Sequence, residues 1–140
     1  MMTAFLIWIF VWDDEIDTSD SLIALDAERV RAYSQQSLNY IHQELGLSAN
    51  GGKKKAVDED QVIIEKIHPN MVLFGEVGRR LLSATDRIQR ESFYHELVNY
   101  IECVEAEHAF RLRGIIPSTE EYVHARFGSV ACRPFMVITE

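Results

Sequence analysis

Residues 5–17 read Phe5-Leu6-Ile7-Trp8-Ile9-Phe10-Val11-Trp12-Asp13-Asp14-Glu15-Ile16-Asp17, so an apolar run leads directly into an acidic cluster of the form D-D-x-x-D. The aromatic and branched residues of the apolar run suit a buried strand and a buried helix equally well. The remainder of the chain carries four helical patterns and no second convincing strand, which favours a helix here too. We therefore predict an all-α fold.

The four helical patterns are defined by periodicity and by capping signals. Small or apolar residues recur every three or four positions in three long segments, which predicts amphipathic helices. These expected helices cover residues 23–45, 69–82 and 86–114. Ser118, followed three positions later by Glu121, forms a capping box, so a last helix is expected to start there and run toward Arg126.

The charge balance excludes one class of partner. The 14 lysines and arginines are opposed by 22 aspartates and glutamates, which gives a formal net charge of -8. A nucleic-acid binder needs a basic face to neutralise phosphates, so we expect no nucleic-acid partner. Lys53-Lys54-Lys55 follow the breaker residues Gly51-Gly52, and we interpret them as a solvated surface loop.

Length and cysteine content indicate a single cytoplasmic domain over residues 1–140. Cys103 and Cys132 are too few for a disulfide framework, and no Cys/His pattern suggests zinc. The apolar run from Ala4 to Trp12 is much shorter than the roughly 20 residues that a membrane-spanning helix needs. It also lacks the flanks of a signal peptide. We therefore expect no membrane span, and the sequence indicates no particular oligomeric state.

The acids at the end of the apolar run have a geometry that suits a divalent metal. On a helix Asp13 and Asp17 are one turn apart on the same face, whereas Asp14 points about 100° away. Mg²⁺ usually binds proteins through one or two carboxylates and completes its shell with water and phosphate oxygens. Such an ion can withdraw charge from a leaving diphosphate. The alternative interpretation is a solvated acidic helix end.

Two stretches of the chain resemble class I terpene synthases, particularly the fungal and bacterial sesquiterpene cyclases. The family's aspartate-rich motif, at the end of an active-site helix, is similar to Phe10-Val11-Trp12-Asp13-Asp14-Glu15-Ile16-Asp17. The family's stretch that leads to its diphosphate-sensing arginine is similar to Glu105-Ala106-Glu107-His108, Arg111, Gly114-Ile115-Ile116-Pro117-Ser118, Glu121-Tyr122 and Arg126. Both matches occur in the family's order.

The resemblance implies roles for four residues within part of the class I terpenoid synthase helical bundle. Asp13 would be a catalytic residue and the principal Mg²⁺ ligand, with Asp17 and Asp14 beside it in the metal motif. Arg126 would be the second catalytic residue and would donate hydrogen bonds to the diphosphate, a role that suits its rigid fork of donors. The implied substrate is an isoprenyl diphosphate, with farnesyl diphosphate favoured, and the product would be a sesquiterpene.

Helix geometry also suggests a wall for the isoprenoid chain. Phe10 is three residues before Asp13 and Ile9 is four before it, so both lie about one turn from the expected metal. An aromatic face at that position could stabilise carbocations, and apolar walls exclude water. Phe10 and Ile9 are therefore candidate substrate-binding residues, with a plain core role as the alternative.

The chain also departs from the family. The family's second metal motif, N-D-x-x-S-x-x-x-E, does not occur within residues 1–140, and the helices expected before residue 5 are missing. Ser129, with Val130 or Ala131, stands where related enzymes have a polar linker and a glycine that assists ionisation. We therefore expect a central fragment of a catalytic domain that has little or no cyclase activity on its own.

Other enzyme classes fit the sequence less well. An isoprenyl diphosphate synthase also uses D-D-x-x-D, but arginines usually follow its motif closely, and here the first arginine after Asp17 is Arg29. A dehalogenase-type phosphatase needs D-x-D-x-T/V on a strand, which this spacing does not match. A di-iron bundle is suggested by two E-x-x-H pairs, which end at His68 and His108. Pro69 makes the first pair unsuited to a helix interior, and we interpret both as chance pairs.

One non-enzymatic interpretation stays open at this point. A chain of 140 residues could be a decayed remnant, or a helical interaction module that keeps the middle of the fold without its chemistry. Metal dependence discriminates between this interpretation and a diphosphate-binding site. An interaction module needs no Mg²⁺, whereas a diphosphate site should bind diphosphate only when Mg²⁺ is present.

Overall fold

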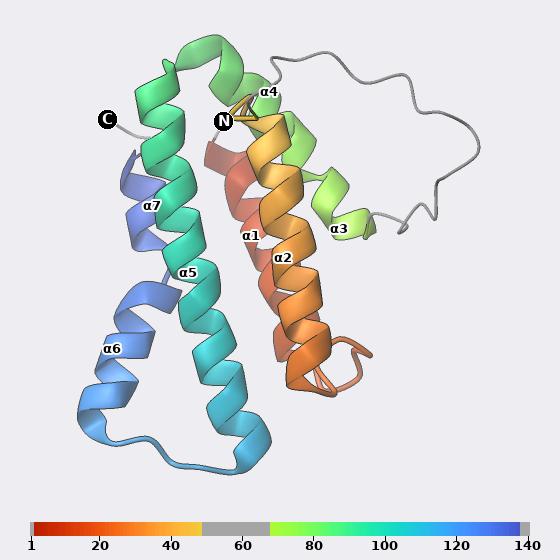
Figure 1. Cartoon of the computed structure of the whole chain (residues 1–140), viewed down its shortest axis with the longest axis vertical. Helices are drawn as coiled ribbons and strands as arrows, with labels where there is room; N and C mark the ends of the chain where they lie inside the picture. The colour runs from red at the N-terminus through yellow and green to blue at the C-terminus, as the bar shows by residue number, and fades with distance from the viewer. Residues whose placement is uncertain (1, 49–67, 138–140) are drawn as a thin grey trace.

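The computed structural model describes residues 2–48 and 68–137, and every regular element in these two ranges is a helix (Figure 1). In chain order the helices are α1 (Met2–Asp17), α2 (Ala27–Glu44), α3 (Pro69–Val72), α4 (Phe74–Ala84), α5 (Arg87–Arg113), α6 (Thr119–Ser129) and α7 (Cys132–Val137). The predicted all-α fold is confirmed. No described helix is both long enough and apolar enough to cross a membrane.

The apolar run at the start of the chain is helical and forms the centre of the core. The buried stripe of α1 consists of Phe5, Trp8, Trp12 and Ile16, each at most 1% exposed. Its rings pack edge to face on neighbouring helices, Trp8 on Phe74 of α4 at 4.9 Å between centroids and Phe5 on Phe93 of α5 at 5.4 Å. Burial of one such side chain contributes about 1.5–3 kcal/mol, so this stripe anchors α1 against both neighbours.

A buried hydrogen bond fixes how α1 is turned about its own axis. The Trp12 indole N–H donates to Ser37 Oγ of α2 at 2.8 Å, and the Trp12 ring stacks on Tyr33. Ser37 in turn donates to the backbone carbonyl of Tyr33. A buried donor left without an acceptor costs about 1–3 kcal/mol. Because Asp13 is the next residue, the direction of its side chain is set by this contact.

The second predicted helix begins later than expected. Periodicity placed its start at Ile23, but α2 begins at Ala27, because the Asp26 carboxylate accepts the backbone N–H of Arg29 and caps the helix at that point. Ile23 still packs on the core from the preceding loop. Ile23 thus fits the periodic spacing of apolar residues although it lies in the loop before the helix.

The helix predicted over residues 69–82 is divided into two. Pro69 opens α3 as expected, but α3 ends at Val72, and α4 starts at Phe74. The apolar positions of the two helices still form one buried stripe, with Met71, Phe74, Val77 and Leu81 each at most 1% exposed. The predicted lysine loop, Lys53-Lys54-Lys55, lies outside the described residues.

The long helix α5 stands between the N-terminal helices and the C-terminal pair α6 and α7 (Figure 1). An Asp86 capping box starts α5, and Gly114, in the left-handed conformation with φ 61°, ends it. The predicted Ser118 and Glu121 capping box starts α6. The short helix α7 was not predicted. The chain therefore folds back after Gly114, and α6 lies against the half of α5 that faces the end of α1.

Candidate functional site

The acids at the end of α1 are not explained by helix stability. Asp13, Asp14 and Asp17 occupy the C-terminal turns of α1, and no basic residue lies in the last turn. The C-terminus of a helix carries partial negative charge, so each carboxylate there is unfavourable by a few tenths to about 1 kcal/mol. Local helix stability therefore does not account for the acidic cluster.

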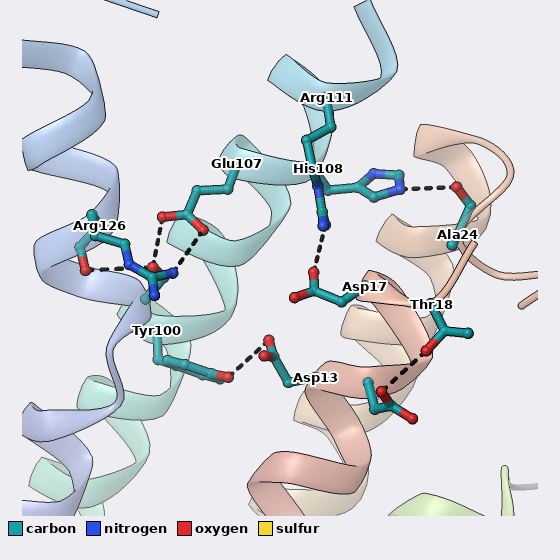
Figure 2. A network of polar contacts seen from close by, with 11 residues as sticks. Asp13, Asp17, Thr18, Ala24, Tyr100, Glu107, His108, Arg111 and Arg126 are labelled. Carbon is teal, nitrogen blue, oxygen red and sulfur yellow. Dashed lines mark hydrogen bonds and ion pairs between the residues drawn. The ribbon is translucent and has the colours of Figure 1, made fainter. Parts of the chain in front are cut away.

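Asp13 is half-buried and points toward α5. Its carboxylate accepts a hydrogen bond from the Tyr100 hydroxyl at 3.1 Å (Figure 2). Burial raises the pKa of Asp13, and the negative charges of Asp17 and Glu107 raise it further. The Tyr100 hydrogen bond and the positive charge of Arg111 act in the opposite direction. The fold thus holds a carboxylate where its negative charge is unfavourable unless a cation comes close.

The other two acids of the motif have different partners. Asp17 is exposed and accepts a hydrogen bond from Arg111 Nη2 of α5 at 2.6 Å, as Figure 2 shows. Asp14 is also exposed and accepts a hydrogen bond from the hydroxyl of Thr18 at 3.1 Å. Asp13 and Asp17 therefore both interact with α5, whereas Asp14 interacts within its own segment. This division agrees with the helix geometry that was expected for the three residues.

Arg126 reaches the same region from α6. Its Nη1 atom lies 3.6 Å from a carboxylate oxygen of Glu107, and the Ser129 hydroxyl donates to Glu107 at 2.7 Å. Just beyond Ser129 the helix is interrupted at Val130 and Ala131, the latter with φ 55°, before α7 begins. The Glu107 carboxylate is thus contacted by two polar side chains from the end of α6, those of Arg126 and Ser129.

A single cavity joins the two stretches that were matched separately in the sequence. It has a volume of about 480 Å³. Its charged lining residues are Asp17, Glu107, Arg111 and Arg126. Its apolar lining comes from the end of α5, the connecting turn and α6, namely Phe110, Ile115, Ile116, Pro117, Tyr122 and Ala125. Asp13 is outside this lining and adjoins it through its electrostatic contacts with Asp17, Glu107 and Arg111.

The two candidate wall residues on α1 lie on different faces of the helix. Ile9 is 3% exposed and belongs to the hydrophobic core, whereas Phe10 is 69% exposed. Phe10 continues a surface of apolar side chains on α1 that includes Leu6 and Ile7, both exposed. Of the two residues, Phe10 is the one that is accessible to a ligand.

Tyr100 and Glu107 are site residues to which the sequence analysis assigned no role. Tyr100 lies in the buried apolar stripe of α5, and Glu107 was quoted only as part of the stretch that resembles the family. Their spacing carries a signal, because positions seven apart lie on one helix face, and Arg111 is a further turn along that face. The sequence therefore shows that these polar residues share one helix face, but not that the face is directed at the acidic motif.

The donor set fits a hard divalent cation such as Mg²⁺. Asp13 and Asp17 offer carboxylate oxygens, and the electrostatic repulsion between them would be relieved by a bound cation. Within residues 2–48 and 68–137, no group of three His, Cys, Asp or Glu side chains is arranged to hold a metal by itself. Mg²⁺ bound through one or two carboxylates completes its shell with water and phosphate oxygens, so two acids suffice.

The second E-x-x-H pair does not form a metal site. His108 is 3% exposed, and its Nε2 atom donates to the backbone carbonyl of Ala24 at 2.9 Å. This contact ties α5 to the loop that follows α1. His108 is therefore a core residue that positions the loop, in agreement with the interpretation of this pair as a chance match.

The fold and the site together define an all-α protein in which an acidic helix end and an arginine meet at an apolar cavity. The family described as "Terpene synthase family 2, C-terminal metal binding" matches residues 4–140. The chain belongs to this terpene synthase family, as the resemblance of its two motifs indicated.

A sequence relative supports the same assignment. The chain is 26% identical to a protein named sesquiterpene cyclase hepA from Aspergillus oryzae, over 99% of this chain and 36% of that protein. The chain thus spans about a third of the length of this relative. No solved structure matches the chain with significance.

Proposed function

We propose that the chain carries the first metal and diphosphate site of a terpene synthase. The reaction would be the Mg²⁺-dependent ionisation of an isoprenyl diphosphate, followed by cyclisation to a sesquiterpene and release of diphosphate. Farnesyl diphosphate is the favoured substrate, since the relative is named a sesquiterpene cyclase. The observation that carries the proposal is the cavity lined by both Asp17 of the acidic motif and Arg126.

In this proposal Asp13 and Asp17 hold Mg²⁺, with Asp14 as a further acid of the motif. A Mg²⁺ ion held by these residues would supply Lewis-acid stabilisation of the diphosphate leaving group. Arg126 donates hydrogen bonds to the diphosphate oxygens. Its contact with Glu107 at 3.6 Å is longer than a charge-assisted hydrogen bond, so its guanidinium donors remain available for a ligand.

The apolar side chains of the cavity suit an isoprenoid chain. Ile115, Ile116 and Tyr122 line the cavity, and all three are exposed in this chain. We propose that the isoprenoid chain extends from there over the exposed apolar face of α1, where the Phe10 ring can stabilise passing carbocations. Ile9 supports that face from within the core.

We also propose that these 140 residues alone have little or no cyclase activity, because the family's second metal motif is not part of the sequence. A cytoplasmic location is proposed as well, in keeping with the free thiols of Cys103 and Cys132. The purified chain, incubated with farnesyl diphosphate and Mg²⁺, should release no cyclic hydrocarbon at an ordinary rate. Normal turnover to cyclic products would contradict this part of the proposal.

Titration with inorganic diphosphate tests the site itself. The chain should bind diphosphate only when Mg²⁺ is present, and Asp13→Ala and Arg126→Ala should each remove most of that binding. Glu28→Ala and Arg31→Ala on α2 are the controls, because they remove the same charges from exposed positions that lie outside both motifs and do not line the cavity. If wild-type chain binds no diphosphate with Mg²⁺, the non-catalytic helical module becomes the better interpretation.

A further inference from the structure

Gly128 lies at a very close approach of α6 to α5. A Cβ atom added to it would stand 2.2 Å from Cys103 Sγ and 2.9 Å from Cys103 Cβ. Gly128 is buried inside α6. Alanine is favoured over glycine in a helix by about 1 kcal/mol, so local helix propensity opposes glycine here. The requirement for glycine at this position is therefore one of space between the two helices.

The close approach occurs beside the polar groups that α6 delivers to the candidate site. Arg126 and Ser129 flank Gly128 in sequence, and both contact Glu107, one turn further along α5 than Cys103. We infer that Gly128 is a positioning residue for Arg126. By letting α6 pack directly on α5, it sets the distance at which the guanidinium enters the cavity. This inference rests on the proposed role of Arg126 in diphosphate binding.

The neighbour of Gly128 has little freedom to move away. The Cys103 thiol can change rotamer, but its Cβ is fixed to the backbone of α5, and at 2.9 Å it is already too close for an added carbon. Carbon atoms pack best at about 3.5–4.0 Å, so an alanine at position 128 would push α6 outward by roughly 1 Å. A displacement of about 1 Å is enough to impair a preorganised site severely.

The test compares two alanine substitutions that create similar clashes in different places. Gly128→Ala displaces α6 from α5. Gly78→Ala is the matched control, because a Cβ there would stand 2.8 Å from Glu44 Cβ and 2.9 Å from the Glu44 carbonyl oxygen, between α4 and α2. Both variants should lose stability in thermal unfolding. Only Gly128→Ala should weaken Mg²⁺-dependent binding of inorganic diphosphate, by about tenfold or more, measured where both variants are folded.

A swap of the two residues should restore the site. Cys103→Gly combined with Gly128→Ala moves the space from α6 to α5. The roughly 1 kcal/mol of helix propensity gained at position 128 exceeds the loss at position 103, because cysteine is itself a weak helix former. Diphosphate binding by this double variant should return to within about twofold of wild type, which lies inside the usual additivity error of roughly 0.5 kcal/mol. A purely structural role for Gly128 predicts that the affinity of the folded Gly128→Ala chain equals that of wild type, and this result would overturn the inference.

A second measurement does not depend on any ligand. In a Cys132→Ser background, Gly128→Ala should increase the alkylation rate of the Cys103 thiol, which displacement of α6 uncovers, whereas Gly78→Ala should not. If the wild-type chain does not bind diphosphate, the proposed function is wrong. The alkylation rates still show whether Gly128 sets the distance between α5 and α6, because they do not depend on a ligand. Equal alkylation rates in the two variants would reject that geometric role.

Discussion

Replacement of Tyr100 by phenylalanine removes one hydroxyl from the candidate site and leaves the packing in place. The Tyr100 ring is 2% exposed and packs on Trp12 at 5.9 Å between centroids, contacts that phenylalanine keeps. What is lost is the hydrogen bond from the hydroxyl to the Asp13 carboxylate at 3.1 Å. The variant therefore isolates the contribution of that bond to the free energy of unfolding.

The expected loss follows from the burial of the two partners. A hydrogen bond to a charged group contributes about 1.5–3 kcal/mol. Asp13 is only half-buried, so water replaces part of the lost interaction, and we expect Tyr100→Phe to cost about 1–2 kcal/mol. For a chain of this length that corresponds to a fall in Tm of roughly 3–8 °C.

The assay is a double-mutant cycle with Asp13→Asn, followed by urea denaturation. If the bond to the ionised carboxylate is responsible, Tyr100→Phe should cost about 1 kcal/mol more in wild type than in the Asp13→Asn background, which exceeds the additivity error of about 0.3–0.5 kcal/mol. The hydrogen bond favours ionised Asp13 and lowers its pKa. The cost should therefore shrink as the pH falls through the raised pKa of Asp13. Additive effects at every pH would refute the reasoning.

Three further predictions follow from the same geometry. Because burial and neighbouring acids raise the pKa of Asp13 above 3.8, its ionised form destabilises the fold at neutral pH, and this penalty disappears as the pH falls toward 3.8. At neutral pH the Asp13→Asn variant should therefore unfold at a higher urea concentration than wild type, and in acid the two should unfold together. A variant less stable than wild type at neutral pH would contradict a raised pKa of Asp13. With Mg²⁺ present, inorganic diphosphate at about 100 times its Kd should stabilise the chain against thermal unfolding by about 2.7 kcal/mol. After Mg²⁺ is removed with EDTA, diphosphate should give no stabilisation. Stabilisation that survives EDTA would argue against a metal-dependent site. Ile9→Ala should cost about 2–5 kcal/mol because Ile9 is buried, whereas Phe10→Ala, at an exposed position, should stay within about 0.5 kcal/mol in the same denaturation experiment. Similar costs for the two variants would show that Phe10 also has a core role.

The helices were predictable because their signals are local. Gly114 supplied the expected end of the 86–114 helix, and Ser118 with Glu121 supplied the start of the last one. The errors were also local in origin. Ile23 continued the apolar period, but the Asp26 cap starts α2 only at Ala27, so a capping hydrogen bond prevailed over periodicity.

The candidate site was predictable in part. Helix geometry placed Asp13 and Asp17 on one face and Asp14 on another, and their hydrogen-bond partners agree with that division. Tyr100 and Glu107 were missed because a tyrosine in an apolar stripe resembles core, and a glutamate on a helix resembles surface. Their roles become visible only when α1 lies opposite α5.

The sequence by itself determined the helical fold, the acidic end of α1 and the arginine that follows a capping box. Those features depend on residues within a few positions of one another, because helix periodicity and capping hydrogen bonds both act between neighbours in the sequence. Only the tertiary structure decided that Asp17 pairs with Arg111, that Arg126 shares a cavity with Asp17, and that a Cβ at Gly128 would clash with Cys103. Each of these depends on how α6 folds back onto α5 and how the Trp12 contact turns α1. Packing between distant segments sets both arrangements, and no short-range pattern encodes it.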